Sequence, residues 1–310
     1  MHTPVLLEEI VTGLGLERFE ASAGGKTSGK GRNQGRGIVI DCTLNAGGHA
    51  KAILERYEDV SVIGIDADPE AIERAATLQK KFPGRLFIYH SNFARVTDVV
   101  SEHGDGKIIG ALMDLGVSSQ QLDGDARGFS FKGAHKLDMR FDPTRQTFTA
   151  SDLLNYGKQE DLVTIIRNYG EERYAGRIAR HIAEARVIAP IETTEQLAEI
   201  IMAAVPAAYK RMKIHPATRT FQAVRIAVND ELGNLQRGLE GVWKTCAPGA
   251  RLAVISFHSL EDRIVKQTMR GMVSTGQGTL INKKVMTASR TETGDNPRSR
   301  SAKLRIIEKI

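Results

Sequence analysis

The sequence is poor in cysteine, proline and aromatic residues, and each shortage excludes a class of protein. Its 310 residues include 2 cysteines, 9 prolines and 1 tryptophan, and only 5% are aromatic. Cys42 and Cys246 cannot by themselves build a disulfide framework or a zinc site, so a reducing cytosol is the expected compartment. No apolar run reaches the roughly 18 residues that a membrane span needs. The first residues have neither a basic nor an apolar region, and no secretory signal is expected.

Apolar residues are plentiful enough to form a core. They make up 41% of the chain, which excludes wholesale disorder, and the length indicates one large or two ordinary domains. There are 43 Lys and Arg against 37 Asp and Glu, which gives a formal net charge of +6 and a sequence pI of about 9.3. This excess fits a polyanionic partner, and it also fits an ordinary solvated surface.

The order of the predicted elements indicates an open α/β sheet. Short apolar runs predict strands at residues 38–41, 61–66, 85–89, 108–114, 251–257 and 302–308. Helices are predicted at residues 4–16, at 49–57 and from Asp68-Pro69 onward, where Asp is the N-cap and Pro opens the first turn. Buried strands that alternate with helices are typical of a parallel sheet covered on both faces.

A helical insertion interrupts this alternation. Residues 150–205 are predicted to be mostly helical, and one apolar stripe from Phe221 to Leu239 predicts a long helix. Residues 271–300 are polar and are expected to form a loop. We therefore divide the chain into a sheet domain of residues 1–121 and 222–310, with a flexible basic glycine-rich linker at 21–37, and an inserted substrate-recognition domain of residues 122–221.

The segments that follow the first two strands predict a nucleotide-type ligand. Asp41-Cys42-Thr43-Leu44-Asn45-Ala46-Gly47-Gly48-His49 follows the first strand, and its small residues allow a ligand to approach the backbone of the next helix start. The second strand ends in Asp66, whose carboxylate can accept hydrogen bonds from ribose hydroxyls. The loop lacks the Gly-x-Gly-x-x-Gly spacing that seats a pyrophosphate. This favours S-adenosylmethionine, with a nicotinamide-dependent dehydrogenase as the alternative.

Collinear motifs along nearly the whole chain resemble one known family. They comprise His2–Leu6, Met113–Asp123, Gly128–Phe131, Leu137–Arg140, His215–Ala223, Ser256–Arg263 and Asn296–Arg305. Together they resemble the bacterial 16S ribosomal RNA cytosine-N4 methyltransferases, the RsmH or MraW family. The resemblance implies a class I, Rossmann-like S-adenosylmethionine-dependent methyltransferase sheet with an inserted helical domain. It also implies methyl transfer to N4 of a cytidine in the decoding region of 16S rRNA, with the rRNA expected to be part of the small ribosomal subunit and the reaction expected to take place in the cytoplasm.

The same resemblance assigns the cofactor-binding residues by position. They are Gly47, Gly48, His49, Asp66, Phe93, Asp114 and Gln121. Phe93 either stacks on adenine or packs in the core. Asn45 stands where the family pattern has glycine, and since Asn tolerates a positive φ better than other residues, the turn is expected to survive. Asn45 is also the reason to keep a third alternative, a non-catalytic RNA-binding or assembly factor with the same fold.

The catalytic residues do not follow from the sequence, although two side chains are candidates. Asp114 is positioned after the fourth strand to meet the cofactor amine or the target amine, and His258 either lines the target pocket or orders its own loop. The target base must be flipped or single-stranded, and basic residues are expected to contact its flanking phosphates. The candidates are Lys132, Lys136, Arg140, Lys210, Arg211, Lys213 and Arg219, with His215 among the last group. A homodimer is left open as the assembly state.

Overall fold

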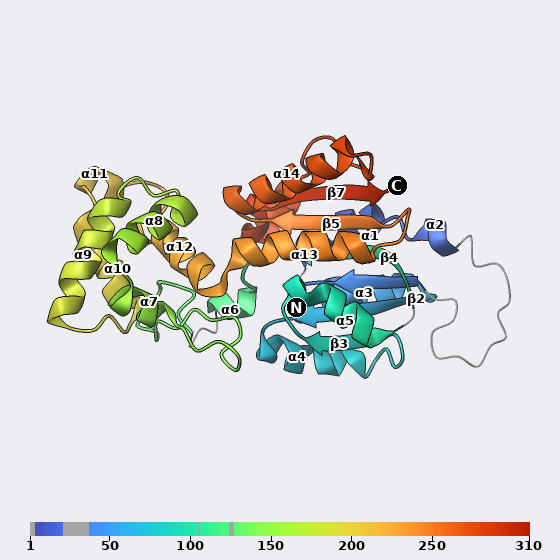
Figure 1. Ribbon diagram of the computed structural model, residues 1–310, viewed down its shortest axis with the longest axis horizontal. Coiled ribbons are helices and arrows are strands. Elements are labelled where there is room, and N and C mark those ends of the chain that lie inside the picture. The colour runs from blue at the N-terminus through green and yellow to red at the C-terminus, as the bar shows by residue number, and fades with distance from the viewer. Residues whose placement is uncertain (1–3, 21–36, 105, 124–126) are drawn as a thin grey trace. The chain divides into compact units, whose positions relative to one another are not determined.

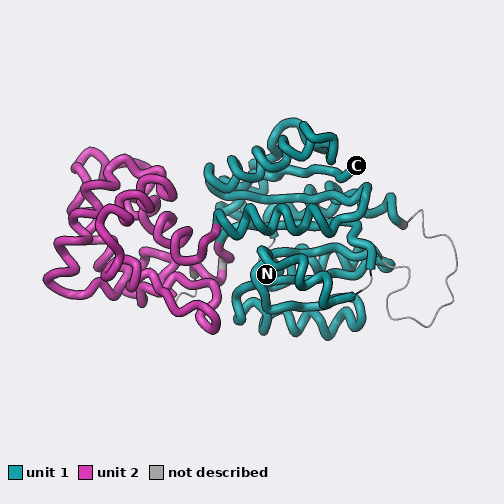
Figure 2. Tube along the Cα trace, in the orientation of Figure 1, with its two compact units in different colours: residues 1–116, 232–310 teal, residues 117–231 magenta. Residues whose placement is uncertain are grey.

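The computed structural model describes residues 4–20, 37–104, 106–123 and 127–310. They form two compact units, residues 1–116 with 232–310 and residues 117–231 (Figure 2). The helical unit thus extends further at both ends than the 122–221 expected from the sequence. The basic linker, apart from Gly37, lies outside the described residues, as do His2 and Thr3 of the first motif. No helix in the described ranges is both long and apolar enough to cross a membrane.

The first unit is built on a seven-stranded sheet with the order β3-β2-β1-β4-β5-β7-β6 (Figure 1). β1 to β5 are parallel, and β7 is antiparallel to both of its neighbours. The strands are β1 Gly37–Asp41, β2 Val60–Asp66, β3 Leu86–His90, β4 Lys107–Asp114, β5 Arg251–Ser256, β6 Gly278–Leu280 and β7 Lys303–Lys309. The six expected strands are confirmed, and the last of them, β7, runs in the opposite direction to the parallel strands and lies between β5 and β6.

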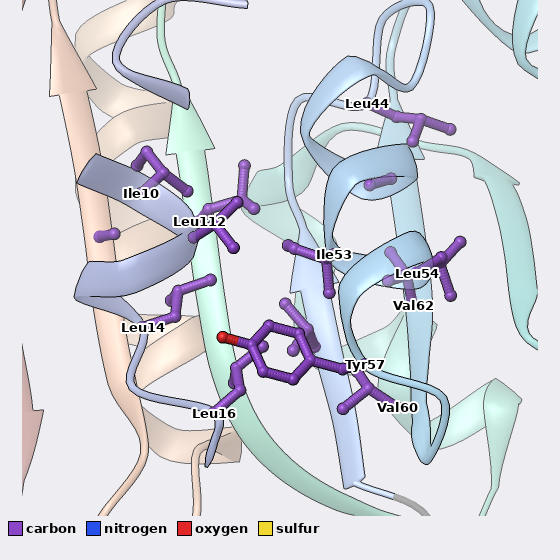
Figure 3. Close-up of a cluster of buried hydrophobic side chains, with 14 of the residues drawn as sticks. Ile10, Leu14, Leu16, Leu44, Ile53, Leu54, Tyr57, Val60, Val62 and Leu112 are labelled. Atoms are coloured by element: carbon purple, nitrogen blue, oxygen red, sulfur yellow. The ribbon is translucent and has the colours of Figure 1, made fainter. Parts of the chain in front are cut away.

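Helices cover both faces of this sheet, because alternate strand residues point to opposite sides. Val39 of β1 and Leu112 of β4 pack under α1, α3 and α4, as Figure 3 shows for part of this cluster. Ile40 and Met113 point to the other face, under α5, α13 and α14. The helices are α1 Leu7–Gly13, α2 Glu17–Glu20, α3 Gly48–Arg56, α4 Pro69–Gln79, α5 Val96–His103, α13 Glu231–Thr245, α14 Ser259–Ser274 and α15 Arg290–Asp295. The Asp68 side chain caps α4 as predicted, accepting from the N–H of Glu70 at 3.0 Å.

The prediction of a loop at residues 271–300 is wrong for much of this range. α14 continues to Ser274, β6 adds an edge strand, and α15 is followed by the 3-10 turn η2, Pro297–Ser301. β6 has only three residues, and its pairing with β7 does not depend on a long apolar run. α15 is polar and starts with a Ser289 cap, so it lacks the apolar periodicity from which a helix is predicted.

The second unit is a bundle of helices around its own core. Its helices are α6 Ser119–Asp123, α7 Ala150–Tyr156, α8 Gln159–Gly170, α9 Ala175–Ile188, α10 Thr194–Ala204, α11 Ala207–Lys210 and α12 Ala217–Asn229. A capping box opens α10, in which the Thr193 side chain accepts from the N–H of Gln196 and the Gln196 side chain accepts from the N–H of Thr193. Leu162 and Ile166 on α8 are fully buried, in line with their helical spacing.

The apolar stripe from Phe221 to Leu239 is divided between two helices rather than belonging to one. Asp230 has a φ of 47°, which ends α12, and α13 begins at the next residue. Phe221 packs in the core of the helical unit, whereas Leu239 packs on the sheet of the other unit. The prediction of one long helix is therefore wrong, because the left-handed residue Asp230 interrupts an otherwise helical spacing.

Candidate functional site

Three carboxyl groups lie at the carboxyl ends of adjacent parallel strands. Asp41 ends β1, Asp66 ends β2 and Asp114 ends β4, and these strands are neighbours in the order β2-β1-β4. Ligands of open α/β sheets bind beyond this edge. Burial raises the pKa of Asp41 to about 7, of Asp66 to about 6 and of Asp114 to about 8, and the charge of Asp41 adds to the shift at Asp114. The edge therefore gathers acidic groups that burial makes costly to ionise.

Asp66 shapes the loop after β1. Its Oδ2 accepts from the N–H of Asn45 at 2.7 Å, and its Oδ1 accepts from the N–H of Asp68 at 2.9 Å. Asn45 has a φ of 49°, as the sequence predicted for the position where the family has glycine. A carboxylate offers about four lone-pair sites. Asp66 therefore holds the loop and still has acceptor capacity for further donors.

Three oxygens in this region are buried and lack a donor among the described residues. They are Oδ2 of Asp41, Oδ1 of Asn45 and Oδ1 of Asp114. The backbone N–H of Asp114 donates to Thr43 Oγ1 at 2.7 Å, and the N–H of Thr43 donates to Asp41 Oδ1 at 3.2 Å. A buried acceptor without a donor is costly. A ligand that brings hydrogen-bond donors or a cation to this edge therefore fits these side chains.

Asp41 is a site residue that the sequence reasoning did not single out. Only 1% of it is exposed, although it ends a strand at the ligand edge. The signal was present, because a carboxylate at the end of the first strand stands next to the other two in a parallel sheet. The sequence alone does not place Asp41 beside Asp66 and Asp114, because the strand order β2-β1-β4 cannot be derived from apolar runs.

The Gly47-Gly48-His49 motif fixes the start of α3 and anchors the N-terminal segment. Gly47 is the N-cap with a φ of 77°, and a Cβ there would come within 2.5 Å of Leu78. A Cβ on Gly48 would come within 2.4 Å of Pro4. His49 is buried and its Nε2 lies 3.1 Å from the carbonyl oxygen of Val5, to which it must donate. Burial lowers the pKa of His49 to about 4, so the ring is neutral.

Phe93 lies against the helix α13 and is half-buried. It opens the 3-10 turn η1, Phe93–Arg95, directly after β3. A Cβ on Gly238 would come within 2.5 Å of its ring and within 3.4 Å of Met113. One side of the Phe93 ring thus packs on the core of the sheet unit, as one of the two predictions expected. The ring is only half-buried, so the other prediction, stacking on adenine, stays open.

His258 is the N-cap of α14. Its Nδ1 accepts from the N–H of Glu261 at 3.3 Å, and its Nε2 lies 3.1 Å from Glu261 Oε1. The Glu261 carboxylate in turn accepts from the N–H of Phe257 at 2.8 Å. Both ring nitrogens of His258 therefore face Glu261. Nδ1 thus orders the start of α14, whereas Nε2 is buried and makes no hydrogen bond within the described residues, so both interpretations of His258 stay predictions.

Gln121 belongs to the helical unit. Its side-chain oxygen accepts from the N–H of Ser118 at 2.8 Å, and its own N–H donates to Ser118 Oγ at 3.1 Å. These reciprocal bonds form the start of α6. They account for Gln at this position through the local fold, and its expected cofactor contact stays a prediction.

The basic residues proposed for RNA contact have different surroundings. Lys132, Lys136, Lys210, Arg211 and Lys213 are exposed and have no ion pair among the described residues. Arg219 donates to the carbonyl of Glu171 at 3.2 Å.

Arg140 differs from this group because its guanidinium is held inside the helical unit. Only 17% of its side chain is exposed, and Nη2 lies 2.6 Å from Asp138 Oδ2. It also donates to the carbonyl oxygen of Gln146. The ion pair raises the pKa of Arg140 and lowers that of Asp138, although burial alone raises the latter. Arg140 thus stabilises the turn at Met139, whose φ is 59°, and its sequence-based place on an RNA surface has no support here.

The strand order, the single reversed strand and the acidic edge together define a class I methyltransferase fold. Residues 1–310 match the model of the MraW methylase family, and the chain belongs to that family. It is 46% identical to the Ribosomal RNA small subunit methyltransferase H of Symbiobacterium thermophilum, over 100% of this chain and 96% of that one. It is 44% identical to the protein of the same name from Synechococcus elongatus, over 100% and 95%.

Solved structures are more distant. A putative rRNA methylase from Clostridium thermocellum covers 100% of both chains with a TM-score of 0.45 and 9% sequence identity.

Proposed function

We propose that this protein transfers a methyl group from S-adenosylmethionine to N4 of a cytidine in the decoding region of 16S rRNA. Membership of a methylase family and the names of the relatives at 44–46% identity support methylation of small-subunit rRNA. The choice of cytidine N4 and of the decoding region rests on the motifs that the chain shares with that family. The proposed reaction belongs to the cytoplasm, where small subunits are assembled.

The observation that carries the cofactor assignment is the set of three buried oxygens without donors among the described residues, Asp41 Oδ2, Asn45 Oδ1 and Asp114 Oδ1. S-adenosylmethionine has an ammonium group and two ribose hydroxyls, which are all hydrogen-bond donors. A pyrophosphate would instead bring negative charge towards Asp41, Asp66 and Asp114. The donor set therefore fits S-adenosylmethionine better than a nicotinamide dinucleotide, and the methylase family favours the same choice.

Each residue has a role that follows from its place at the strand ends. The N–H groups of Asn45 and Asp68 donate to the Asp66 carboxylate, and its remaining lone pairs are proposed to accept hydrogen bonds from the ribose hydroxyls. Asp41 and Asp114 are proposed to hold the ammonium, and Phe93 to stack on adenine. When bound, the cofactor supplies a methyl group on a sulfonium, which is an electrophile at neutral pH.

The target amine needs positioning more than it needs a base. The lone pair of the cytosine amine is delocalised into the ring, so it attacks only when it is held close to and in line with the methyl group. Asp114 Oδ1 is a buried acceptor to which an amino or ammonium group can donate. The amine can lose its proton after transfer. We accordingly assign no general base, and we propose that His258 orders its loop through Nδ1.

The alternative of a non-catalytic assembly factor depended on Asn45. This residue adopts the positive φ that the turn requires, so its presence does not disturb the backbone of the cofactor loop. The sequence departure therefore gives no structural reason to expect lost activity.

Binding and transfer test the proposal in turn. Titration calorimetry with S-adenosylmethionine and with NAD should give heat of binding only for the methyl donor. Tritiated methyl groups should then be transferred to small subunits purified from a strain that lacks the corresponding methyltransferase. Binding of NAD alone would revive the dehydrogenase alternative, and tight subunit binding without transfer would favour the assembly factor.

A further inference from the structure

A column of aromatic rings in the helical unit ends at the surface. Phe221 of α12 is buried, and the ring of Phe131 meets it edge to face with 5.6 Å between centroids. The imidazole of His215 stacks on Phe131 almost in parallel, at 4.6 Å and 14°. Exposure increases along the column, because Phe221 belongs to the core, Phe131 is half-buried and His215 is exposed. One face of the imidazole is thus covered by Phe131, and the side chain stays accessible to solvent.

The His215 ring is held in place by a second contact. Its Nδ1 accepts from the N–H of Ala217, the first residue of α12, at 3.2 Å. A ring nitrogen that accepts carries no proton, so the proton of the neutral ring is on Nε2. Nε2–H has no partner among the described residues, and it can donate to a ligand. Exposed side chains usually keep their rotational freedom, whereas this one has lost it before any partner binds.

The two chain segments that carry Phe131 and His215 are basic and contain no acidic residue. Segments 127–136 and 207–219 together contain seven Lys and Arg and neither Asp nor Glu. Lys132 follows Phe131 directly, and Lys213 is two residues before His215. The stack joins these two segments, which are about 80 residues apart in sequence. A planar apolar surface flanked by unpaired cations suits a single-stranded nucleic acid, whose bases stack and whose phosphates carry the charge.

We propose that His215 is a stacking platform for a base of single-stranded RNA, with Lys132 and Lys213 contacting the adjoining phosphates. This inference rests on the proposed function, because it names a contact of the same rRNA substrate. His215, the first residue of the His215–Ala223 motif, would then contact RNA in addition to the start of α12.

Two variants of His215 separate stacking from capping. His215→Phe keeps an aromatic ring on Phe131 but loses the acceptor for the Ala217 N–H. His215→Asn keeps an acceptor but loses the ring. The probe is a single-stranded RNA oligonucleotide that contains 2-aminopurine, whose fluorescence is quenched on stacking, and the same variants are assayed for binding to small subunits. We expect His215→Asn to lose the quenching and about tenfold or more in affinity, in the range of one stacked base, and His215→Phe to retain both.

A matched control is Tyr156→Ala, which removes an aromatic side chain that is 83% exposed. This variant should bind RNA as the wild type does. Loss of affinity in His215→Phe with normal affinity in His215→Asn would overturn the proposal, since only capping would then matter. An equal loss in Tyr156→Ala would also overturn it. If the wild type binds RNA but never methylates small subunits, the proposed function fails while the platform is still tested by the quenching.

Discussion

At the scale of single residues, Asn45 combines two properties that the sequence could not separate. Its positive φ was predictable, because glycine stands there in the family and Asn is the side chain that tolerates this conformation best. The burial of its Oδ1 without a donor was not predictable, since it depends on the packing of three strands. Asn45 therefore fits the turn and also presents an acceptor that a ligand can satisfy.

Replacing Asn45 tests both properties. Asn45→Gly keeps the turn and removes the acceptor, so affinity for S-adenosylmethionine should fall by about 0.5–1.5 kcal/mol, the size of one hydrogen bond. Asn45→Val should weaken binding further, because a β-branched residue resists a positive φ. Calorimetry gives the affinities and thermal melting checks the fold. Equal or tighter binding in Asn45→Gly would mean that only the backbone matters at this position.

The raised pKa of Asp114 couples cofactor binding to the release of a proton. A pKa of about 8 leaves the carboxyl largely protonated at pH 7 in the free protein. A cation that binds beside it favours the carboxylate, so binding should release up to about one proton at pH 7. Calorimetry in buffers with different ionisation enthalpies counts this proton. The release should decrease in Asp114→Asn, with the remainder coming from Asp41, whose pKa is about 7, and a proton count near zero in the wild type would argue against an ammonium at these carboxyls.

The same raised pKa has a consequence for stability. In the unfolded chain an aspartate titrates near 3.8, well below the folded value. Between these values the folded state binds more protons than the unfolded state, so the free energy of unfolding decreases as the pH rises. The contribution of Asp114 is thus fully present below about pH 4 and is lost as the pH rises through about 8.

At the scale of elements, most of the fold could be predicted, because apolar runs and helical periodicity are local signals. The parallel strands, the cap of α4 and the mostly helical stretch of residues 150–205 lie where the pattern puts them. The elements that were missed depend on non-local or single-residue effects. β6 exists through pairing with β7, and the break between α12 and α13 depends on the left-handed Asp230.

The packing of α13 on Phe93 gives a prediction at this scale. Gly238→Ala adds a Cβ that would come within 2.5 Å of the Phe93 ring, which must then shift. If Phe93 stacks on adenine, affinity for S-adenosylmethionine should fall several-fold, although Ala suits a helix better than Gly by about 1 kcal/mol. Gly271→Ala in α14 is the matched control, because no atom lies within 4 Å of its added Cβ. Unchanged binding in Gly238→Ala would leave Phe93 as a core residue only.

At the scale of the whole molecule, the chain divides its tasks between two units. The sheet unit gathers Asp41, Asp66 and Asp114 at one edge, and the helical unit has the exposed cations and the aromatic column. The net charge of +6 predicted a polyanionic partner only weakly. The distribution of the cations is more informative. Arg140 forms an ion pair with Asp138 inside the helical unit, whereas Lys132 and Lys213 are exposed and have no ion pair among the described residues.

Nucleoside mapping of the methylated product tests the central claim most directly. Small subunits from a strain without the corresponding methyltransferase are incubated with the protein and labelled S-adenosylmethionine, and the 16S rRNA is digested and analysed by mass spectrometry. The account predicts label in N4-methylcytidine, from one site in the decoding region, and loss of the label in Asp66→Ala. Label in another nucleoside, or no label in subunits that the protein binds tightly, would contradict it.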